Sequence, residues 1–286
     1  MNMKRLIALA LALVLSLALA ACGSGAAPSP SASAPAESAP AESASAESDL
    51  DYVKGKGALV IGYTVYAPMN YTDDNGEFTG FDTELAKAVC EKLGVEPQFQ
   101  EIVWETKEIE LAGKTIDCIW NGMTLDPERE ANMACTVPYV KNAQVVVMKA
   151  DADYADTSSL IGKSVCAEVG SAGETQILGN EETKPDANLA QADYVGKSVQ
   201  TDCLMEVAAG TCDAAVLDMT LANAMIGEGT DYAGLKIVYE LAVENYGVAF
   251  RQGSDVRDAV NEIFAELVAD GSLGALADKY GLELAD

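Results

Sequence analysis

The chain has 286 residues and a formal net charge of −27, because 45 acidic side chains outnumber 18 basic ones. Such a surface repels phosphate backbones and anionic headgroups, which argues against nucleic acid as a partner. The chain has no histidine, and this excludes serine–histidine and cysteine–histidine catalysis, histidine zinc sites and the usual proton shuttle near neutral pH.

The N-terminus has the pattern of a secretory signal. Lys4 and Arg5 precede an apolar run at 6–21, which is shorter than the roughly 20 residues that cross a bilayer core. The run ends in Ala21-Cys22, which resembles the bacterial lipoprotein box, where the cysteine is lipidated and becomes the mature N-terminus. We expect residues 1–21 to be a signal peptide, and Cys22 to carry a lipid that anchors the chain at the outer face of the cell membrane. The alternative is ordinary cleavage, with Cys22 incidental.

Residues 22–49 are predicted to form a disordered acidic tether. The segment consists mostly of Ser, Ala, Pro and Glu and has no aromatic residue, so it cannot bury enough apolar surface to fold. A flexible coil of about 26 residues has an r.m.s. reach of about 30 Å. We expect this tether to hold a folded domain off the membrane.

The composition becomes globular near residue 50, where short apolar runs alternate with amphipathic stretches as in βαβ units. Residues 58–61 predict a buried strand, and Asp74-Asn75-Gly76 predicts a hairpin turn. A helix follows, with an apolar residue at every fourth position from Phe81 to Leu93 and Gly94 at its end. Further strands are predicted at 116–120, 144–148, 164–167, 214–217 and 247–250, and further helices at 201–209, 256–270 and 273–280. About 237 residues in this pattern exceed one typical core, which predicts two α/β lobes.

Six cysteines remain after Cys22, and none belongs to a Cys-x-x-Cys pair. A zinc site is therefore not expected. In an exported protein they could form disulfides, or they could pack as small hydrophobic side chains, and the sequence leaves both options open. The six are Cys90, Cys118, Cys135, Cys166, Cys203 and Cys212.

Five segments of the globular part form a series in order and spacing. They are 80–86; Trp104 with 111–117; 122–129 with Pro138-Tyr139; 160–165 with Gly170-Ser171-Ala172-Gly173; and 210–218. Each is weak alone, but together, behind a lipoprotein signal, they resemble the bacterial extracellular solute-binding proteins of family 3. Members of that family deliver polar amino acids to ATP-driven importers.

The resemblance implies an α/β fold of the two-lobed periplasmic-binding-protein type (type II), with two hinge strands and the ligand buried between the lobes. It places lobe 1 at 50–140 and 246–286, and lobe 2 at 145–242. The hinges would lie near 139–144 and 243–246. No cofactor or metal is implied.

The resemblance also assigns a pair of opposite charges to an amino-acid zwitterion. Arg129 matches the arginine that binds the α-carboxylate, which favours a planar fork donor. It follows Asp126-Pro127, an N-cap with proline at the first helical position. Asp218 matches the aspartate that pairs with the α-ammonium. The alternatives are a solvated surface arginine for Arg129 and, for Asp218, the N-cap of a helix from Thr220 onward.

Other matched residues complete the implied site. Thr124 matches a hydroxyl that contacts ligand, and Gly122 a close backbone approach. Ser171 and Ala172 belong to a loop whose free N–H groups, at the start of a helix, would bind an anion. For all four the alternative is ordinary turn chemistry.

Side-chain selectivity is assigned to three further positions. Tyr66 and Trp104 match aromatic residues that contact the ligand side chain, although core packing is the alternative for both. Glu168 matches a position that faces the far end of the ligand, or else it is a solvated glutamate. Trp120 replaces a smaller aliphatic residue and is expected to reshape the pocket.

The resemblance therefore implies a monomeric, non-enzymatic substrate-binding component of an amino-acid ABC importer. Its partners would be a free amino acid, polar or basic, and an ABC permease with its ATPase. One alternative is a module that presents bound ligand to a separate receptor. Another is an enzyme similar to cyclohexadienyl dehydratase, for which Glu168 would be the candidate catalytic acid.

Overall fold

The computed structural model describes residues 48–286. The predicted signal peptide at 1–21, Cys22 and the tether up to residue 47 lie outside the described residues. None of the helices in 48–286 combines the length and the apolar composition that a membrane crossing needs.

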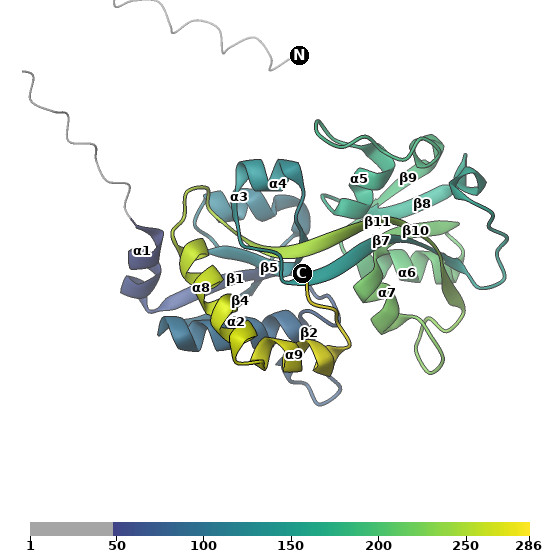
Figure 1. Cartoon of the computed structure of the whole chain (residues 1–286). Helices are drawn as coiled ribbons and strands as arrows, with labels where there is room; N and C mark the ends of the chain where they lie inside the picture. The colour runs from purple at the N-terminus through teal and green to yellow at the C-terminus, as the bar shows by residue number, and fades with distance from the viewer. Residues whose placement is uncertain (1–47) are drawn as a thin grey trace, which may run out of the picture. The chain divides into compact units, whose positions relative to one another are not determined.

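One sheet of nine strands runs through the folded region (Figure 1). The strands of this sheet are β1 (Ala58–Tyr63), β4 (Glu96–Glu101), β5 (Cys118–Thr124), β6 (Ala134–Cys135), β7 (Val140–Lys149), β8 (Ser164–Glu168), β9 (Asp193–Lys197), β10 (Ala214–Asp218) and β11 (Leu235–Phe250). Their order is β4-β1-β5-β11-β7-β10-β8-β9, and β6 pairs with β11 beside this path. The outer strands are parallel to one another, whereas β7 and β11 are antiparallel to each other and to their outer neighbours. A separate hairpin joins β2 (Tyr71–Thr72) to β3 (Phe78–Thr79).

Helices cover the sheet at both of its ends. They are α1 (Asp49–Lys56), α2 (Phe81–Leu93), α3 (Lys107–Ala112), α4 (Pro127–Asn132), α5 (Ala172–Leu178), α6 (Gln200–Ala209), α7 (Met219–Met225), α8 (Val256–Ala269) and α9 (Ser272–Tyr280), with 3-10 turns at Trp104–Thr106, Thr157–Leu160 and Leu189–Gln191. In α2 the predicted apolar stripe is buried, and Gly94 ends the helix in the left-handed region with φ +75°. Its N-cap, Gly80, must lack a side chain because a Cβ there would lie 2.1 Å from the carbonyl oxygen of Met69.

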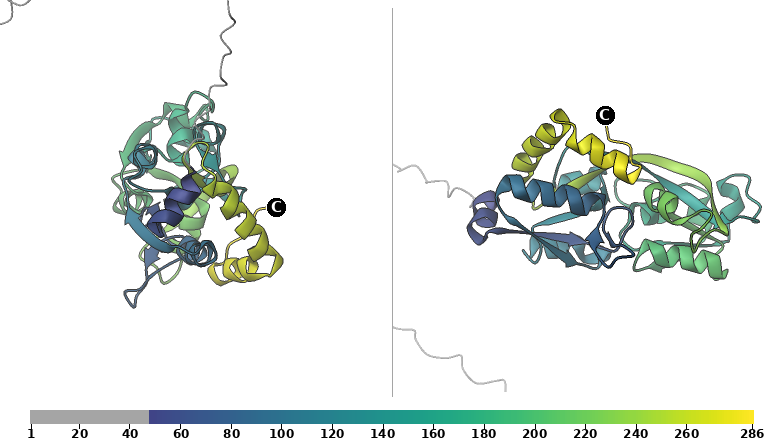
Figure 2. Two further views of the ribbon diagram at one scale, coloured as in Figure 1. Left: turned by 90° about the vertical axis from the view of Figure 1, so that its left-hand side faces the viewer. Right: turned by 90° about the horizontal axis from the view of Figure 1, so that it is seen from below.

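The sheet and its helices form two lobes joined by β7 and β11 (Figures 1 and 2). One lobe contains β1, β4, β5 and α2, together with α8 and α9 from the end of the chain. The other contains β8, β9, β10 and α5 to α7. The two long strands pair from Val140 with Tyr246 to Lys149 with Leu235, so they pass through both lobes. The ladder has irregularities between Ile237 and Tyr239 and between Glu240 and Ala242. β7 and β11 are the strands that connect the two lobes.

The strands and helices predicted from apolar runs are present, but their extents differ. β5 begins at Cys118 rather than at residue 116, and β7 and β11 extend well beyond the predicted 144–148 and 247–250. The edge strands β4 and β9 were not predicted. All residues of both strands are exposed or only partly buried, as at the edge of a sheet, and the two strands therefore lack a strong apolar signal.

The folded region also begins earlier than predicted, which corrects the C-terminal limit of the tether. Ser48 caps α1 by accepting a hydrogen bond from the Asp51 N–H at 3.0 Å. Asp49, which was assigned to the tether, is the first residue of that helix and pairs with Arg251 at 2.9 Å. These contacts fix residues 48 and 49 on the first lobe.

All six cysteines of the globular part are free, and all but Cys135 are buried. In this structure they pack as small hydrophobic side chains, the second of the two predicted options. Trp120 is also buried in the core, 5.8 Å from the ring of Phe264. The expectation that Trp120 reshapes the pocket is therefore wrong. Gly122, at φ +57°, breaks the alternation of β5 between Trp120 and Thr124.

Candidate functional site

A small cavity between the two lobes contains every residue that the sequence predicted for ligand binding. The cavity encloses about 10 Å³, which is room for about one water molecule, so an amino acid enters only if the lobes separate. The lining residues are Tyr66, Trp104, Asn121, Gly122, Thr124, Arg129, Glu168, Ser171, Ala172, Gln200 and Asp218. Asn121 and Gln200 are the two that sequence reasoning missed.

Arg129 reaches the cavity from the first turn of α4, as its capping sequence predicts. The Asp126 carboxylate accepts a hydrogen bond from the Arg129 N–H at 2.8 Å, and Pro127 occupies the first helical position. Arg129 is 6% exposed, and its guanidinium donates to the carbonyl oxygens of Thr124 at 2.9 Å and Gly170 at 3.1 Å. Its Nε lies 3.2 Å from Asp126. A fork donor held in this way is ready to bind a carboxylate.

Asp218 lies at the end of β10, in the other lobe, within a cradle of amide groups. Its Oδ1 accepts hydrogen bonds from Asn142 at 2.7 Å and Gln144 at 2.5 Å, and its Oδ2 accepts one from Gln200. Asp218 occupies the N-cap position of α7, but its side chain makes no capping hydrogen bond. The alternative of a helix cap is therefore not supported, and the carboxylate is oriented by the hinge strand β7 instead.

Glu244 is a second acid beside Asp218 that sequence reasoning did not find. Its Oε1 accepts from the same two amides, Asn142 at 2.6 Å and Gln144 at 2.9 Å, and from the Thr124 hydroxyl at 2.8 Å. Burial raises the pKa of Glu244 to about 8, and the neighbouring Asp218 adds to the rise. Burial likewise raises the pKa of Asp218. Ionisation of both carboxyl groups at once is therefore unfavourable unless they share a proton or a cation lies nearby.

Glu168 is a third acid in the cavity, at the end of β8. It is 3% exposed, and its Oε1 has no hydrogen-bond partner among the described residues. Burial raises its pKa to about 8, with a further contribution from Asp218. Glu168 is thus not a solvated surface glutamate, which was the alternative to ligand contact. A buried carboxyl with a free oxygen can bind a donor group of a ligand.

Tyr66 and Gly122 have structural contacts as well as cavity contacts. The Tyr66 hydroxyl is hydrogen-bonded to the hydroxyl of Tyr246 at 2.5 Å and to that of Thr220. A Cβ at Gly122 would lie 2.8 Å from the Tyr66 ring and 3.0 Å from the Tyr246 ring. Glycine at 122 therefore allows the two tyrosines to pack against β5 beside the cavity.

The loop before α5 has fewer free N–H groups than the sequence predicted. Gly170 N–H donates to Glu174 Oε2 at 2.8 Å, and Ser171 N–H donates to the Glu168 carbonyl at 3.2 Å. The Ser171 hydroxyl caps α5 by accepting from the Glu174 N–H at 3.1 Å. Glu174 therefore already occupies part of the loop that was expected to bind an anion.

Lys107 completes the charged groups near the cavity, and it was also missed. It is 4% exposed, and its ammonium lies 4.8 Å from the centre of the Trp104 ring. Burial and repulsion from Arg129 together lower the pKa of Lys107 to about 8. The site therefore combines the cations Lys107 and Arg129 with the acids Glu168, Asp218 and Glu244.

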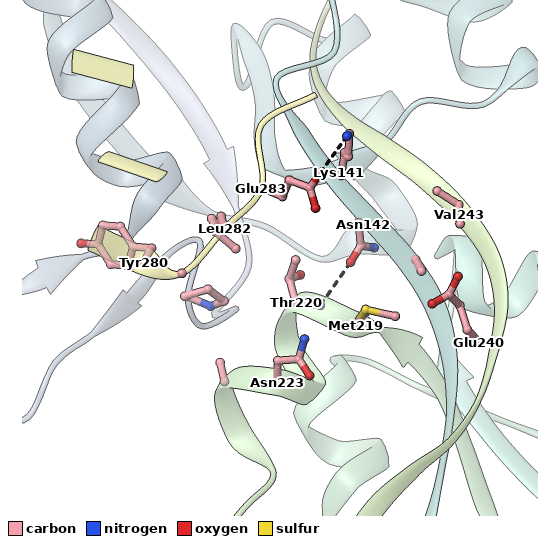
Figure 3. Close-up of a pocket in the computed structure, with 14 residues that line it drawn as sticks. Lys141, Asn142, Met219, Thr220, Asn223, Glu240, Val243, Tyr280, Leu282 and Glu283 are labelled. Atoms are coloured by element: carbon pink, nitrogen blue, oxygen red, sulfur yellow. Dashed lines mark hydrogen bonds and ion pairs between the residues drawn. The ribbon is translucent and has the colours of Figure 1, made fainter. Parts of the chain in front are cut away.

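A second cavity, of about 560 Å³, borders the same hinge strands but shares no lining residue with the first (Figure 3). Among the described residues that line it, Lys141 is the cation, and it is already paired with Glu283 at 2.7 Å. The side-chain oxygen of Asn142, which also lines this cavity, accepts a hydrogen bond from the Thr220 N–H at 3.1 Å (Figure 3). This cavity is larger, but it presents no free cation to a carboxylate.

The family model for "Bacterial extracellular solute-binding proteins, family 3" matches residues 59–283. Among curated proteins, the arginine-binding extracellular protein ArtP of Bacillus subtilis is 28% identical over 229 residues, which cover 79% of this chain and 87% of ArtP. The L-cystine-binding protein TcyJ of Escherichia coli is 29% identical over 236 residues, covering 81% of this chain and 85% of TcyJ.

Solved structures with the same fold include a mutant of ArgBP from T. maritima. It is 30% identical, with a TM-score of 0.73, and the match covers 81% of this chain and 98% of that one. The ancestral amino acid-binding protein AncCDT-1, described as a precursor of cyclohexadienyl dehydratase, is 27% identical, with a TM-score of 0.72 and coverage of 82% and 99%. The fold is thus that of two-lobed periplasmic binding proteins, as predicted.

Proposed function

Because the chain belongs to the bacterial extracellular solute-binding proteins of family 3, we propose that it captures a free amino acid between its lobes and delivers it to an ABC permease with its ATPase. The observation that carries the proposal is the pair of buried opposite charges, Arg129 and Asp218, on opposite sides of one cavity. A zwitterion satisfies both charges only when the lobes are closed, so ligand favours closure.

The ligand that we propose is an amino acid with a cationic side chain. Two acids, Glu168 and Asp218, and one cation, Arg129, line the cavity, so a ligand with one net positive charge lets both acids ionise. A neutral zwitterion leaves one acid protonated. Glu168, with its free Oε1, is our candidate partner for the distal cation. The arginine specificity in the names of ArtP and ArgBP supports this choice, whereas the name of TcyJ points to a polar, neutral alternative.

A thermal-shift screen tests the proposal with L-arginine, L-lysine, L-histidine, L-glutamine and L-cystine. At 100 times its Kd a ligand stabilises by about 2.7 kcal/mol, which raises the Tm by about 5–10 °C for a domain of this size. L-citrulline, the neutral analogue of arginine, should bind at least about tenfold more weakly than L-arginine, because it cannot supply a charge-assisted hydrogen bond.

The variant Glu168→Gln serves as the control for charge selectivity and should bring the arginine-to-citrulline ratio close to one. A chain that no amino acid stabilises would contradict the proposed function. A chain that binds citrulline as tightly as arginine would contradict only the cationic ligand.

We propose no catalytic step. Membership of a family of solute-binding proteins supports this, although AncCDT-1 relates the fold to a dehydratase. The raised pKa of Glu168 would suit a general acid, but the Arg129 and Asp218 pair is the arrangement that an intact zwitterion needs. Recovery of unchanged ligand after prolonged incubation with the protein checks this assignment.

The family is extracellular, so the chain acts outside the cytoplasm. We further propose that Cys22 is lipidated and that residues 23–47 tether the folded domain near its permease. Replacing Cys22 by alanine is expected to move the protein from the membrane fraction into the soluble extracytoplasmic fraction, without altering its amino-acid affinity. Retention of the alanine variant in the membrane fraction would show that the anchor lies elsewhere.

A further inference from the structure

Lys107 has an unusual environment for a lysine. Its ammonium is almost fully buried, although burial of an ammonium is costly unless the group is paired or fully hydrogen-bonded. Within residues 48–286 no carboxylate forms an ion pair with it. Its acceptors are two carbonyl oxygens, that of Trp104 at 3.3 Å and that of Gly170 at 3.0 Å. The second of these belongs to the opposite lobe.

The Gly170 carbonyl oxygen therefore accepts hydrogen bonds from two cationic side chains of the opposite lobe. Lys107 Nζ donates to it at 3.0 Å and Arg129 Nη2 at 3.1 Å. Gly170 has φ +74°, and a Cβ at this position would lie 3.4 Å from Lys107 Nζ and 3.3 Å from the Cα of Glu105. Glycine thus allows the loop of the second lobe to approach the 3-10 turn Trp104–Thr106 of the first. When the lobes separate, both hydrogen bonds must break.

A bound ligand should affect the hydrogen bonds of Lys107 and Arg129 to the Gly170 carbonyl differently. A ligand carboxylate bound by the Arg129 fork competes with the Gly170 carbonyl for the same guanidinium N–H groups. Lys107 is separate from that fork and keeps its bond. We propose that Lys107 is a positioning residue that clamps the second lobe closed over bound ligand through the Gly170 carbonyl. This inference rests on the proposed function, because it assigns Lys107 to the closure of that same site.

The clamp should depend on pH because closure of the lobes buries the Lys107 ammonium and lowers its pKa. The groups that face Lys107 are Arg129 on α4, Asp126 before α4, Glu168 on β8 and Glu108 beside it on α3. Burial and Arg129 lower the pKa of Lys107 to about 8, while the three acids oppose this shift. A pKa that is lower in the closed state than in the open state means that closure favours the neutral amine, which still donates to the Gly170 carbonyl, so the clamp is stronger at pH 9.5 than at pH 7.

The test compares Lys107→Met with Lys54→Met, a matched change of an exposed lysine on α1. Loss of one charge-assisted hydrogen bond should weaken binding of L-arginine, or of the amino acid that binds in the screen above, by about 10- to 100-fold. Most of this change should arise from faster dissociation measured by stopped flow. Lys54→Met should change neither quantity.

Two further readouts separate a clamp from a general structural role. The ratio of the dissociation rates of Lys107→Met and wild type should rise between pH 7 and pH 9.5, because closure of the wild-type lobes no longer buries a charge at the higher pH. X-ray scattering should show a larger radius of gyration for the ligand-free variant than for ligand-free wild type. If Lys107→Met does not fold, Lys107→Gln, which keeps one N–H donor, should show a smaller shift in the same directions.

Equal dissociation rates for wild type and a folded Lys107 variant at pH 7 would overturn the clamp, as would a pH-independent ratio. If wild type binds no amino acid, the proposed function fails, and the clamp is then overturned because it has no ligand to retain. An amino acid that binds with unchanged kinetics in the variant leaves the proposed function intact and refutes only the clamp.

Discussion

Replacing Arg129 by alanine is expected to weaken amino-acid binding by at least about 100-fold, or about 2.7 kcal/mol at 1.4 kcal/mol per tenfold. The guanidinium is the fork donor of the cavity, and a charge-assisted hydrogen bond contributes about 1.5–3 kcal/mol. The variant would also leave the ligand carboxylate unpaired inside a nearly dry site, which costs more than the bond itself. Calorimetric titration at pH 7 measures the effect.

The controls for this variant follow from the other contacts of Arg129. Its hydrogen bonds to the Thr124 and Gly170 carbonyls also support the fold and the closed state, so the Tm of each ligand-free variant must be recorded. Arg129→Lys keeps the charge but loses the planar fork, and it should lose less affinity than alanine. Arg257→Ala, on α8 and ion-paired with Asp258 at 2.7 Å, should leave affinity unchanged. A folded Arg129→Ala variant that binds within threefold of wild type would refute the assignment.

The features that could be predicted from the sequence are mostly local. The pair Asp126-Pro127 predicts the start of a short helix, and this alone places Arg129 in its first turn. A run of four residues at 214–217 predicts β10, and Asp218 must then lie at its end. The rest of the candidate site came from the family resemblance, which brought together residues separated by more than 150 positions, such as Tyr66 and Asp218, that line one cavity.

The residues that were missed depend on pairing between distant strands. Glu244 reaches the site because β11 pairs with β7, which places its carboxyl beside the amides of Asn142 and Gln144. No short motif around Glu244 encodes that register. A weak signal did exist, since Glu244 lies two residues before the buried Tyr246 and alternate residues of a strand share a face. Lys107 gave no signal, because its partner Gly170 is in the opposite lobe.

Tertiary packing also decided the side-chain orientations that were predicted wrongly. Strand alternation places Trp120 on the same face as Thr124, which suggests that both line the pocket. The left-handed conformation of Gly122 between them breaks that alternation, and Trp120 packs in the core. In the same way Glu174 occupies the N–H of Gly170, because a glutamate in the first turn of a helix is attracted to free N–H groups.

The second large effect is expected for Asp218→Asn. The change removes the charge that we propose pairs with the α-ammonium, and it puts an amide N–H₂ where three amide donors converge. Gln144 can turn its amide to compensate, since its Oε1 has no partner among the described residues. We therefore expect the variant to fold and to lose at least about 100-fold in affinity for L-arginine.

The diagnostic result for Asp218→Asn is the loss of preference for a free α-amine. Wild type should bind L-arginine at least about 100-fold more tightly than 5-guanidinopentanoate, which lacks the α-amine, and the variant should bind the two nearly equally. Asp231→Asn, an exposed change in the segment before β11, should keep the wild-type ratio. Glu244→Gln should lose less than Asp218→Asn, because Glu244 shares two amides with Asp218 but does not line the cavity. If Asp218→Asn retains the preference while Glu244→Gln abolishes it, Glu244 is the partner of the α-ammonium and the roles of the two acids are reversed.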